Sequence, residues 1–394
     1  MEKIINWSGR GQQYTSEELK LITEVATLAD PLTQGQYQKQ FEKDFENYLG
    51  QNGHAYAVSS ATAAIELAAI LCQFEKGDEV IIPAHTFVAS AISFARLGCV
   101  IKWADIDFHT RVIDIENIRK LITPKTKALM AVHLYGNAAP MQELQELCSN
   151  HDIILIEDAA QALGGELNHQ KLGTFGDFSC FSFHTHKNIS TLGEGGMLWV
   201  KDPNLAKMVP GLRHNGLRPF ENQEYYWKPA MSNVDFDLQG IWPYNFCMAE
   251  VPSALGSALL KRNDQIIEKR TQRANKFLES FKNFPELIFQ KIQPQSKHAW
   301  HLMTAYYDSE IYGKSRDDLI SSLFNTYKLK TVVQYYPLYR YPIFQKSNMS
   351  EASCPNTDKF FDNMISFPFH EWMSHDDFDE MIKRVQLALI ELRK

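Results

Sequence analysis

The sequence has few cysteines, and none of its six forms a CxxC pair. Paired or regularly spaced cysteines would indicate a disulfide framework or a zinc site, so their lack argues against both. Because most of the six lie inside apolar segments, we expect reduced and largely buried thiols. Such thiols are typical of cytoplasmic proteins, and the cytoplasm is the location that we expect.

The sequence also lacks the signatures of several protein classes. It contains no run of about 18 apolar residues and no apolar signal core near its start, so we expect no membrane partner. Its net charge is −7, which argues against a nucleic-acid partner. No GxGxxG pattern opens a helix, which argues against a nucleotide-binding oxidoreductase.

The chain has 394 residues, and short apolar runs alternate with amphipathic runs between residues 54 and 260. The amphipathic runs at 62–74 and 140–152 are predicted helices. The apolar runs are predicted buried strands at 80–87, 100–107, 128–136, 153–160, 178–184 and 196–200. This alternation predicts an α/β fold with a mostly parallel sheet that helices cover on both faces.

The pattern changes near residue 260. A long charged amphipathic helix is predicted over 261–284, a strand over 327–336, and a terminal helix over 376–394. We therefore predict a large α/β domain with an N-terminal arm over residues 1–260, and a smaller α+β domain over residues 261–394.

Polar residues follow several predicted strands at the point where each strand ends. Ligands of open α/β sheets bind at the carboxyl ends of the strands. Asp158 and Gln161 follow one strand, and Ser182 and Lys187 follow another. Two further segments that would reach the same edge contain Ser59, Ser60, Thr62, His85 and Phe87. We expect these four segments to meet at one site.

Each of these residues also has an ordinary structural explanation. Hydroxyls cap helices, a buried aspartate pairs in a salt bridge, Phe87 belongs to a core, and Lys187 is a solvated surface charge. Together, however, they match the requirements of pyridoxal phosphate. This cofactor needs a lysine for its aldehyde, an acid for its ring nitrogen, donors for its phosphate and an apolar face for its ring.

The stretch SFHTHKNISTLGEGG over residues 182–196 contains other candidate chemistry. His184 and His186 suggest a metal, but the sequence offers no third ligand, so we expect no metal site. The glycine cluster at its end is interpreted as a turn that lets the chain re-enter a strand.

Motifs along the chain occur in the order AVSSATAAIELA, IPAHTFVAS, VHLYGNAAPM, IEDAAQALGG, SFHTHKNISTLGEGG, RHNG, PYNFCMAEVPSALG, HAWHL and QYYPLY. In this order they resemble the DegT/DnrJ/EryC1/StrS family of pyridoxal phosphate-dependent sugar aminotransferases, which have the fold-type-I architecture. The resemblance extends from about Leu32 to the C-terminus.

The resemblance implies a role for each predicted site residue. Lys187 stands at the position of the Schiff-base lysine, and Asp158 at that of the partner of the pyridinium nitrogen. Gln161 would approach the ring hydroxyl, and Phe87 would stack on the ring. The residues that would hold the phosphate are Ser60, Ala61, Thr62 and Ser182. Asn245 would reach the phosphate from a neighbouring subunit, which implies a homodimer with shared active sites.

The implied reaction moves an amino group from glutamate or glutamine to a nucleotide-linked keto-sugar in amino-sugar biosynthesis. The alternatives are a sugar dehydratase or lyase of the same fold, or an acceptor that is a cyclitol or a higher keto-sugar acid. A regulator that kept the fold is a further alternative. Dehydratase relatives have histidine in place of the lysine, so Lys187 favours the aminotransferase.

Three features depart from the family pattern. Ala61 replaces the usual glycine, and Cys247 stands where many members have arginine. The segment 217–242 is longer and more aromatic than expected. Its aromatic residues either line a substrate pocket or pack at a dimer interface, and they include Tyr225, Tyr226, Trp227 and Trp242.

Overall fold

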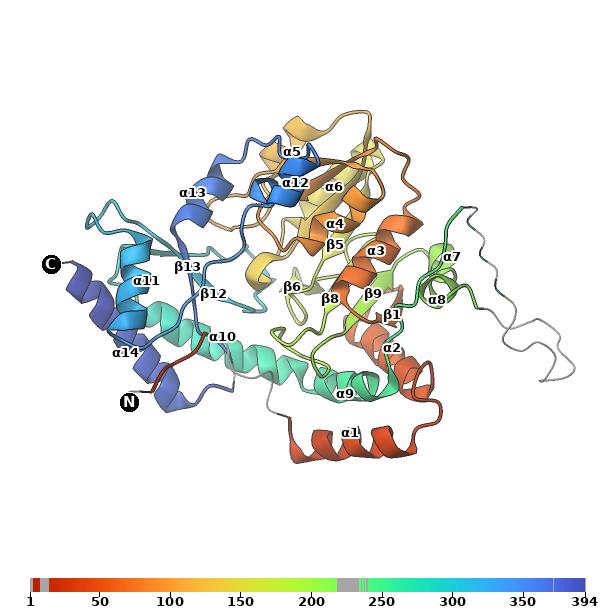
Figure 1. The fold of residues 1–394 in the computed structure, drawn as a ribbon, viewed down its shortest axis with the longest axis horizontal. Coiled ribbons are helices and arrows are strands. Elements are labelled where there is room, and N and C mark those ends of the chain that lie inside the picture. The colour runs from red at the N-terminus through yellow and green to blue at the C-terminus, as the bar shows by residue number, and fades with distance from the viewer. Residues whose placement is uncertain are drawn as a thin grey trace, which may run out of the picture.

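The computed structural model describes residues 3–7, 14–217, 234, 236, 238, 240–370 and 372–393. Its centre is a seven-stranded sheet with the order β1-β9-β8-β5-β4-β2-β3 (Figure 1). The strands are β1 His54–Val58, β2 Glu79–Pro83, β3 Val100–Ala104, β4 Thr126–Val132, β5 Ile154–Asp158, β8 Phe178–Ser182 and β9 Gly196–Val200. The pairs β3–β2, β2–β4, β4–β5 and β5–β8 are parallel, whereas β9 is antiparallel to β1 and β8. The mostly parallel sheet predicted from the sequence is confirmed.

Both faces of the sheet are buried in apolar core clusters. Successive side chains of a strand point to opposite faces, so neighbouring residues belong to different clusters. Ile81, Leu129 and Leu155 belong to one core cluster, whereas their neighbours in sequence belong to another. Helices α3 Ala61–Leu71 and α4 Ala89–Arg96 contribute to the second of these clusters. The helices that cover the opposite face are α2 Gln36–Leu49, α5 Ile115–Leu121, α6 Met141–His151 and α9 Glu250–Lys261.

The predicted helices at 62–74 and 140–152 are confirmed as α3 and α6, and Pro140 is the residue before the first helical residue of α6. The predicted strands are also present, but most end two to four residues earlier than predicted. The residues beyond these strand ends belong to the loops at the sheet edge, and they include His85, Phe87 and His133. The remaining elements of this part are α1 Ser16–Leu28, α7 Pro203–Ala206, α8 Val209–Arg213, the 3₁₀ helix η1 Leu134–Gly136, β6 Glu166–Leu167 and β7 Gln170–Lys171.

The C-terminal part forms a second, antiparallel sheet with its own core (Figure 1, blue). Its strands are β10 Leu287–Phe289, β12 Met303–Tyr307 and β13 Met364–Phe367. The helices beside it are α10 Asn263–Ser280, α11 Arg316–Asn325 and α14 His375–Leu392. The predicted helices over 261–284 and 376–394 therefore correspond to α10 and α14.

The predicted strand over 327–336 is wrong. The segment makes only isolated bridges, from Leu329 to Ile5 and from Val332 to Ser366. Its β-branched and aromatic composition is typical of strands, but its later residues leave the sheet and line a cavity described below.

The division into two domains at residue 260 stays a prediction. Phe344 and Phe360 lie in the C-terminal part of the sequence, yet they pack in the core of the large sheet. They belong to α12 Pro342–Lys346 and α13 Pro355–Asn363, which follow the 3₁₀ helix η2 Leu338–Arg340. The strand β11 Ser296–Lys297 instead pairs with β6 in a small sheet of order β11-β6-β7. Among the described helices, none has both the length and the apolar character needed to cross a membrane.

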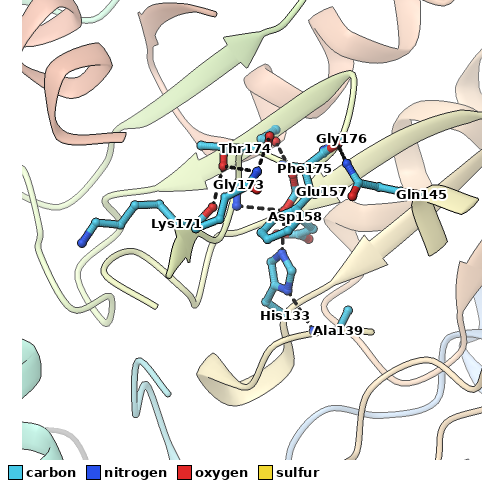
Figure 2. Close-up of polar contacts among 12 residues, drawn as sticks. His133, Ala139, Gln145, Glu157, Asp158, Lys171, Gly173, Thr174, Phe175 and Gly176 are labelled. Carbon is cyan, nitrogen blue, oxygen red and sulfur yellow. Dashed lines mark hydrogen bonds and ion pairs between the residues drawn. The ribbon is translucent and has the colours of Figure 1, made fainter. Parts of the chain in front are cut away.

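The side chain of Glu157 is a buried carboxylate that binds several donors at once (Figure 2). His133 Nε2 donates to it at 2.8 Å. The remaining donors are the backbone N–H groups of Gly173, Phe175 and Gly176 at 2.7–2.8 Å and Ser179 Oγ at 3.1 Å. Burial alone would raise the pKa of Glu157, but the His133 contact and the backbone N–H groups lower it below its ordinary value.

We predict that Glu157→Gln lowers the free energy of unfolding by about 3 kcal/mol at pH 7, because it places an amide among donors that need an acceptor. The folded-state pKa of Glu157 is depressed. The stabilisation is therefore complete above the unfolded pKa of about 4.3 and is lost as the pH falls through the folded pKa. Urea unfolding at several pH values measures both effects.

Glu116→Gln is the matched control, because the Glu116 side chain is 76% exposed and should change the unfolding free energy by less than about 0.5 kcal/mol. Equal stability of the two variants at pH 7 would contradict the prediction.

Candidate active site

A cavity of about 430 Å³ lies at the carboxyl ends of β5 and β8 and at the start of α3. It brings together residues from several segments that are far apart in the sequence. The predicted site residues that line it are Ser60, Ala61, Thr62, Phe87, Asp158, Gln161, Ser182 and Lys187. The expectation that these segments meet at one edge of the sheet agrees with this arrangement.

A larger cavity of about 690 Å³ lies at the opposite edge of the same sheet. Ile154 and Phe178, the first residues of β5 and β8, line it together with Lys201. It contains none of the predicted site residues. Since ligands of such sheets bind beyond the carboxyl ends of the strands, we assign the chemistry to the smaller cavity.

Asp158 is the last residue of β5 and is only 6% exposed. Its carboxylate accepts one hydrogen bond on each oxygen. Ser90 Oγ donates to Oδ2 at 2.7 Å, and the backbone N–H of Ala160 donates to Oδ1 at 3.1 Å. Glu157, its neighbour in the strand, contacts a different set of residues because alternate side chains of a strand point to opposite faces.

Lys187 lies in the turn between β8 and β9, where its backbone N–H donates to His184 O at 2.8 Å. Burial lowers the pKa of Lys187 to about 8, although the nearby charge of Asp158 acts in the opposite direction. About a tenth of this amine is therefore neutral at pH 7, far more than for an ordinary lysine, and a neutral amine is a nucleophile.

The start of α3 has the character of an anion site. Ser60 caps the helix by accepting from the backbone N–H of Ala63 at 3.1 Å. The first N–H groups of any helix lack partners within the helix, and here they belong to Ala61 and Thr62, which line the cavity.

Gly196 explains how Ser182 reaches the start of α3. In the β8–β9 pair, Ser182 lies opposite Gly196. A Cβ atom on Gly196 would lie 2.4 Å from the carbonyl carbon of Ser60 and 2.6 Å from the nitrogen of Ala61. Only glycine allows this close backbone approach, so the glycine cluster of the sequence places β9 against the turn.

Phe87 and Gln161 lie at other walls of the cavity. The Phe87 side chain is 53% exposed and makes an edge-on contact with the ring of Tyr335, so it is not a core phenylalanine. Gln161 Oε1 accepts from the backbone N–H of Tyr135 at 2.7 Å, and Gln161 Nε2 donates to Tyr335 Oη at 3.4 Å. These contacts fix the orientation of the Gln161 amide.

Asn245 is the predicted site residue that this cavity does not include. It is exposed and forms an isolated bridge with His214. Trp242, in the aromatic segment 217–242, is 85% exposed. The other three aromatic residues singled out there, Tyr225, Tyr226 and Trp227, lie outside the described residues.

Several cavity residues were not predicted. They are Trp7, Glu194, His301, Gln334 and Tyr335. His301 lies in the motif HAWHL, and Gln334 and Tyr335 lie in the motif QYYPLY. The sequence therefore marked these three as part of the family pattern but predicted no role for them. Trp7 precedes the region that resembles the family, so no motif of the sequence predicted it. Its indole Nε1 donates to Ser366 Oγ at 3.2 Å, and its ring contacts His186 edge-on.

The described residues fit pyridoxal phosphate. The cavity offers a partly buried amine with a lowered pKa, a buried carboxylate, an exposed aromatic ring and the N–H groups of a helix start. A carboxylate has about four acceptor positions, and Asp158 uses two of them for Ser90 and Ala160, which leaves capacity for a ring N–H.

The sequence model of the DegT/DnrJ/EryC1/StrS aminotransferase family matches residues 12–386. The chain is 34% identical to the spore coat polysaccharide biosynthesis protein SpsC of Bacillus subtilis, over 94% of both chains. It is 31% identical to a GDP-perosamine synthase of Vibrio cholerae, over 89% of this chain and 90% of that one.

Solved structures of similar proteins have the same fold. The aminotransferase PseC of Helicobacter pylori, involved in the biosynthesis of pseudoaminic acid, superposes with a TM-score of 0.88 at 26% identity and covers 99% of this chain and 100% of its own. The GDP-4-keto-6-deoxy-D-mannose-3-dehydratase of E. coli, with bound hydrated pyridoxal phosphate, superposes with a TM-score of 0.86 at 25% identity and covers 97% and 100%.

These similarities confirm the predicted family, the fold-type-I architecture and the cofactor. The chain belongs to the DegT/DnrJ/EryC1/StrS aminotransferase family and is a pyridoxal phosphate-dependent sugar aminotransferase.

Proposed function

We propose that this enzyme transfers the amino group of glutamate or glutamine to a nucleotide-linked keto-sugar. The observation that carries the proposal is the joint presence of Lys187 and Asp158 at one cavity, beside the start of α3. Similarity to a GDP-perosamine synthase and to a dTDP-linked 3-amino-sugar transaminase supports a nucleotide-linked acceptor. Similarity to the SpsC protein supports a place in surface polysaccharide biosynthesis.

When bound, pyridoxal phosphate supplies an aldehyde that receives the amino group and a ring that withdraws electrons from the α-carbon of the donor. Lys187 Nζ, in its neutral form, would hold the aldehyde carbon covalently. Once the donor has displaced it, the same amine would accept the proton of the donor α-carbon and deliver it to the carbon of the former aldehyde, on the other side of the transferred nitrogen. The lowered pKa of Lys187 suits an amine that exchanges protons near neutral pH.

The other cavity residues would bind and orient. Asp158 would accept a hydrogen bond from the ring nitrogen and keep a proton there, because its charge opposes deprotonation. Phe87 would cover one face of the ring, and Gln161 would meet the ring hydroxyl. The phosphate would be held by Ser60, Ala61, Thr62 and Ser182.

We further propose a homodimer in which Asn245 of each subunit completes the site of its partner. Its exposed position outside the cavity of its own chain is compatible with that role. The cytoplasm is the proposed location, which is supported by six free cysteines, four of them buried.

The visible absorption band of the enzyme reconstituted with pyridoxal phosphate tests the proposal. Glutamate or glutamine should bleach the band, and a keto-sugar from a panel of UDP-, dTDP- and GDP-linked 4-keto-6-deoxyhexoses should restore it, with an amine in the product by mass spectrometry. A product that has lost water without gaining an amine would identify a dehydratase. A band that neither amino acid bleaches would overturn the proposal.

Lys187→Ala should reduce transamination by at least about 1,000-fold, because it removes the group that would carry the proton. Single-turnover bleaching by glutamate measures this effect. Lys187→Arg is the matched control, since it keeps the positive charge but offers no neutral amine. Retained turnover in either variant would show that Lys187 does not carry the chemistry.

Asp158→Asn should slow the glutamate half-reaction by about 100-fold or more, because the amide has no charge to keep the ring nitrogen protonated. The amide has nearly the same shape as the carboxylate, so the thermal midpoint should change little. A half-reaction at the wild-type rate would remove Asp158 from its proposed role.

Capture of pyridoxal phosphate by the cofactor-free enzyme should accelerate with pH only up to about pH 8. The pKa of Lys187 is about 8, and the neutral amine attacks the aldehyde, so the rate should gain about twofold between pH 8 and pH 10. An ordinary alkylamine should gain roughly 70-fold over the same interval. Stopped-flow absorbance measures both, with n-butylamine and free cofactor as the reference. A steep rise in the rate of cofactor capture by the enzyme above pH 9 would contradict the lowered pKa of Lys187.

A further inference from the structure

Ser90 is a buried hydroxyl that contacts Asp158 directly. It is the second residue of α4, its side chain is 0% exposed, and its Oγ lies 2.7 Å from Asp158 Oδ2. The family resemblance assigned it no role. Because Ser90 lies outside the residues that line the cavity, a ligand would sense it only through the Asp158 carboxylate.

The direction of the hydrogen bonds in this group follows from the number of protons. An ionised carboxylate only accepts, so the single hydroxyl hydrogen of Ser90 points to Asp158. Thr86 Oγ1 lies 3.0 Å from Ser90 Oγ and must therefore donate to it. Thr86 is 1% exposed, so solvent does not compete for either bond. Two donors in series polarise each other, which strengthens the bond that reaches Asp158.

The segment 86–90 contains the two hydroxyl donors and also a residue that lines the cavity. Phe87 lies between the two hydroxyl residues and exposes its ring at the cavity. The backbone N–H of Ser90 donates to Phe87 O at 3.1 Å, which closes the turn into α4. A single turn therefore positions both an aromatic wall and the donor to one oxygen of Asp158.

We propose that Ser90 is a positioning residue that holds the Asp158 carboxylate in its orientation towards the cavity, with Thr86 as its outer donor. This inference rests on the proposed function, in which Asp158 holds the proton of the cofactor ring nitrogen. A short hydrogen bond from a buried hydroxyl restricts the rotation of the carboxylate group, so that Asp158 is already oriented when the cofactor binds. Ser90 thereby determines the orientation in which Asp158 meets the ring nitrogen, although Ser90 itself does not contact the cofactor.

Ser93 shows that burial alone does not produce such a contact. It lies in the same helix and is also 0% exposed, yet its Oγ has no hydrogen-bond partner among the described residues. Ser93→Ala therefore removes a buried hydroxyl of α4 without disturbing Asp158, and it serves as the matched control for Ser90→Ala.

The test compares the wild type with Ser90→Ala, Ser90→Thr and Ser93→Ala, each reconstituted with pyridoxal phosphate. We expect Ser90→Ala to slow single-turnover bleaching by glutamate by at least about 10-fold and to weaken cofactor binding severalfold. The bleaching rate at saturating glutamate should fall more than the apparent affinity for glutamate, because a misoriented Asp158 affects the chemical step rather than donor binding. Ser90→Thr should restore most of the rate, and Ser93→Ala should match the wild type.

Equal bleaching rates and equal cofactor dissociation constants for Ser90→Ala and Ser93→Ala would overturn the inference. If Ser90→Ala fails to fold, Thr86→Val replaces it, because this variant leaves the Ser90 hydroxyl in place and should shift the same readouts in the same direction by a smaller factor. If glutamate and glutamine do not bleach the wild-type band, the proposed function fails. The cofactor dissociation constants of Ser90→Ala and Ser93→Ala then still decide the role of Ser90.

Discussion

The binding of one buried carboxylate by donors from neighbouring segments holds the catalytic edge of the sheet together. Glu157 on β5 accepts from His133, just beyond the end of β4, and from the loop that leads into β8. An unpaired charge at this depth would be strongly destabilising, so the donors must stay in place. Strands β5 and β8 are thereby fixed beside β4, and they carry Asp158 and Ser182 to the cavity, with Lys187 in the turn after β8. The two adjacent carboxylates of β5 have separate surroundings, because Glu157 binds buried donors and Asp158 lines the cavity.

The lowered pKa of Lys187 depends on the fixed positions of these strands, because they keep the amine buried. Lys187 loses solvation and its pKa falls to about 8, while the charge of Asp158 limits the fall. A looser site would admit water and return the amine towards its ordinary pKa. A similar logic applies to His301, because burial and the nearby charges of Lys187 and Arg270 hold its pKa well below the ordinary value. His301 therefore presents a neutral imidazole to the cavity, beside an amine that is itself only partly charged.

The sequence allowed the sheet and most of the cavity to be predicted, because polar residues that follow apolar strands must lie at a sheet edge. Asp158 and Lys187 were identified in this way. The strand over 327–336 could not be rejected, because its composition favours a strand and only the tertiary position of Tyr335 shows otherwise. Ser90 and Trp7 were missed for a different reason: one acts through a hydroxyl within a helix, and the other reaches the cavity from a distant segment.

The path of the N-terminal segment has a practical consequence for handling the protein. Lys3 pairs with Asp377, the backbone of Ile5 bonds to Lys328 and Lys330, and Trp7 then reaches the wall of the cavity. The first residues of the chain thus join the C-terminal sheet to the active site. Deleting residues 3–7 would therefore disturb the C-terminal core and the cavity wall at the same time.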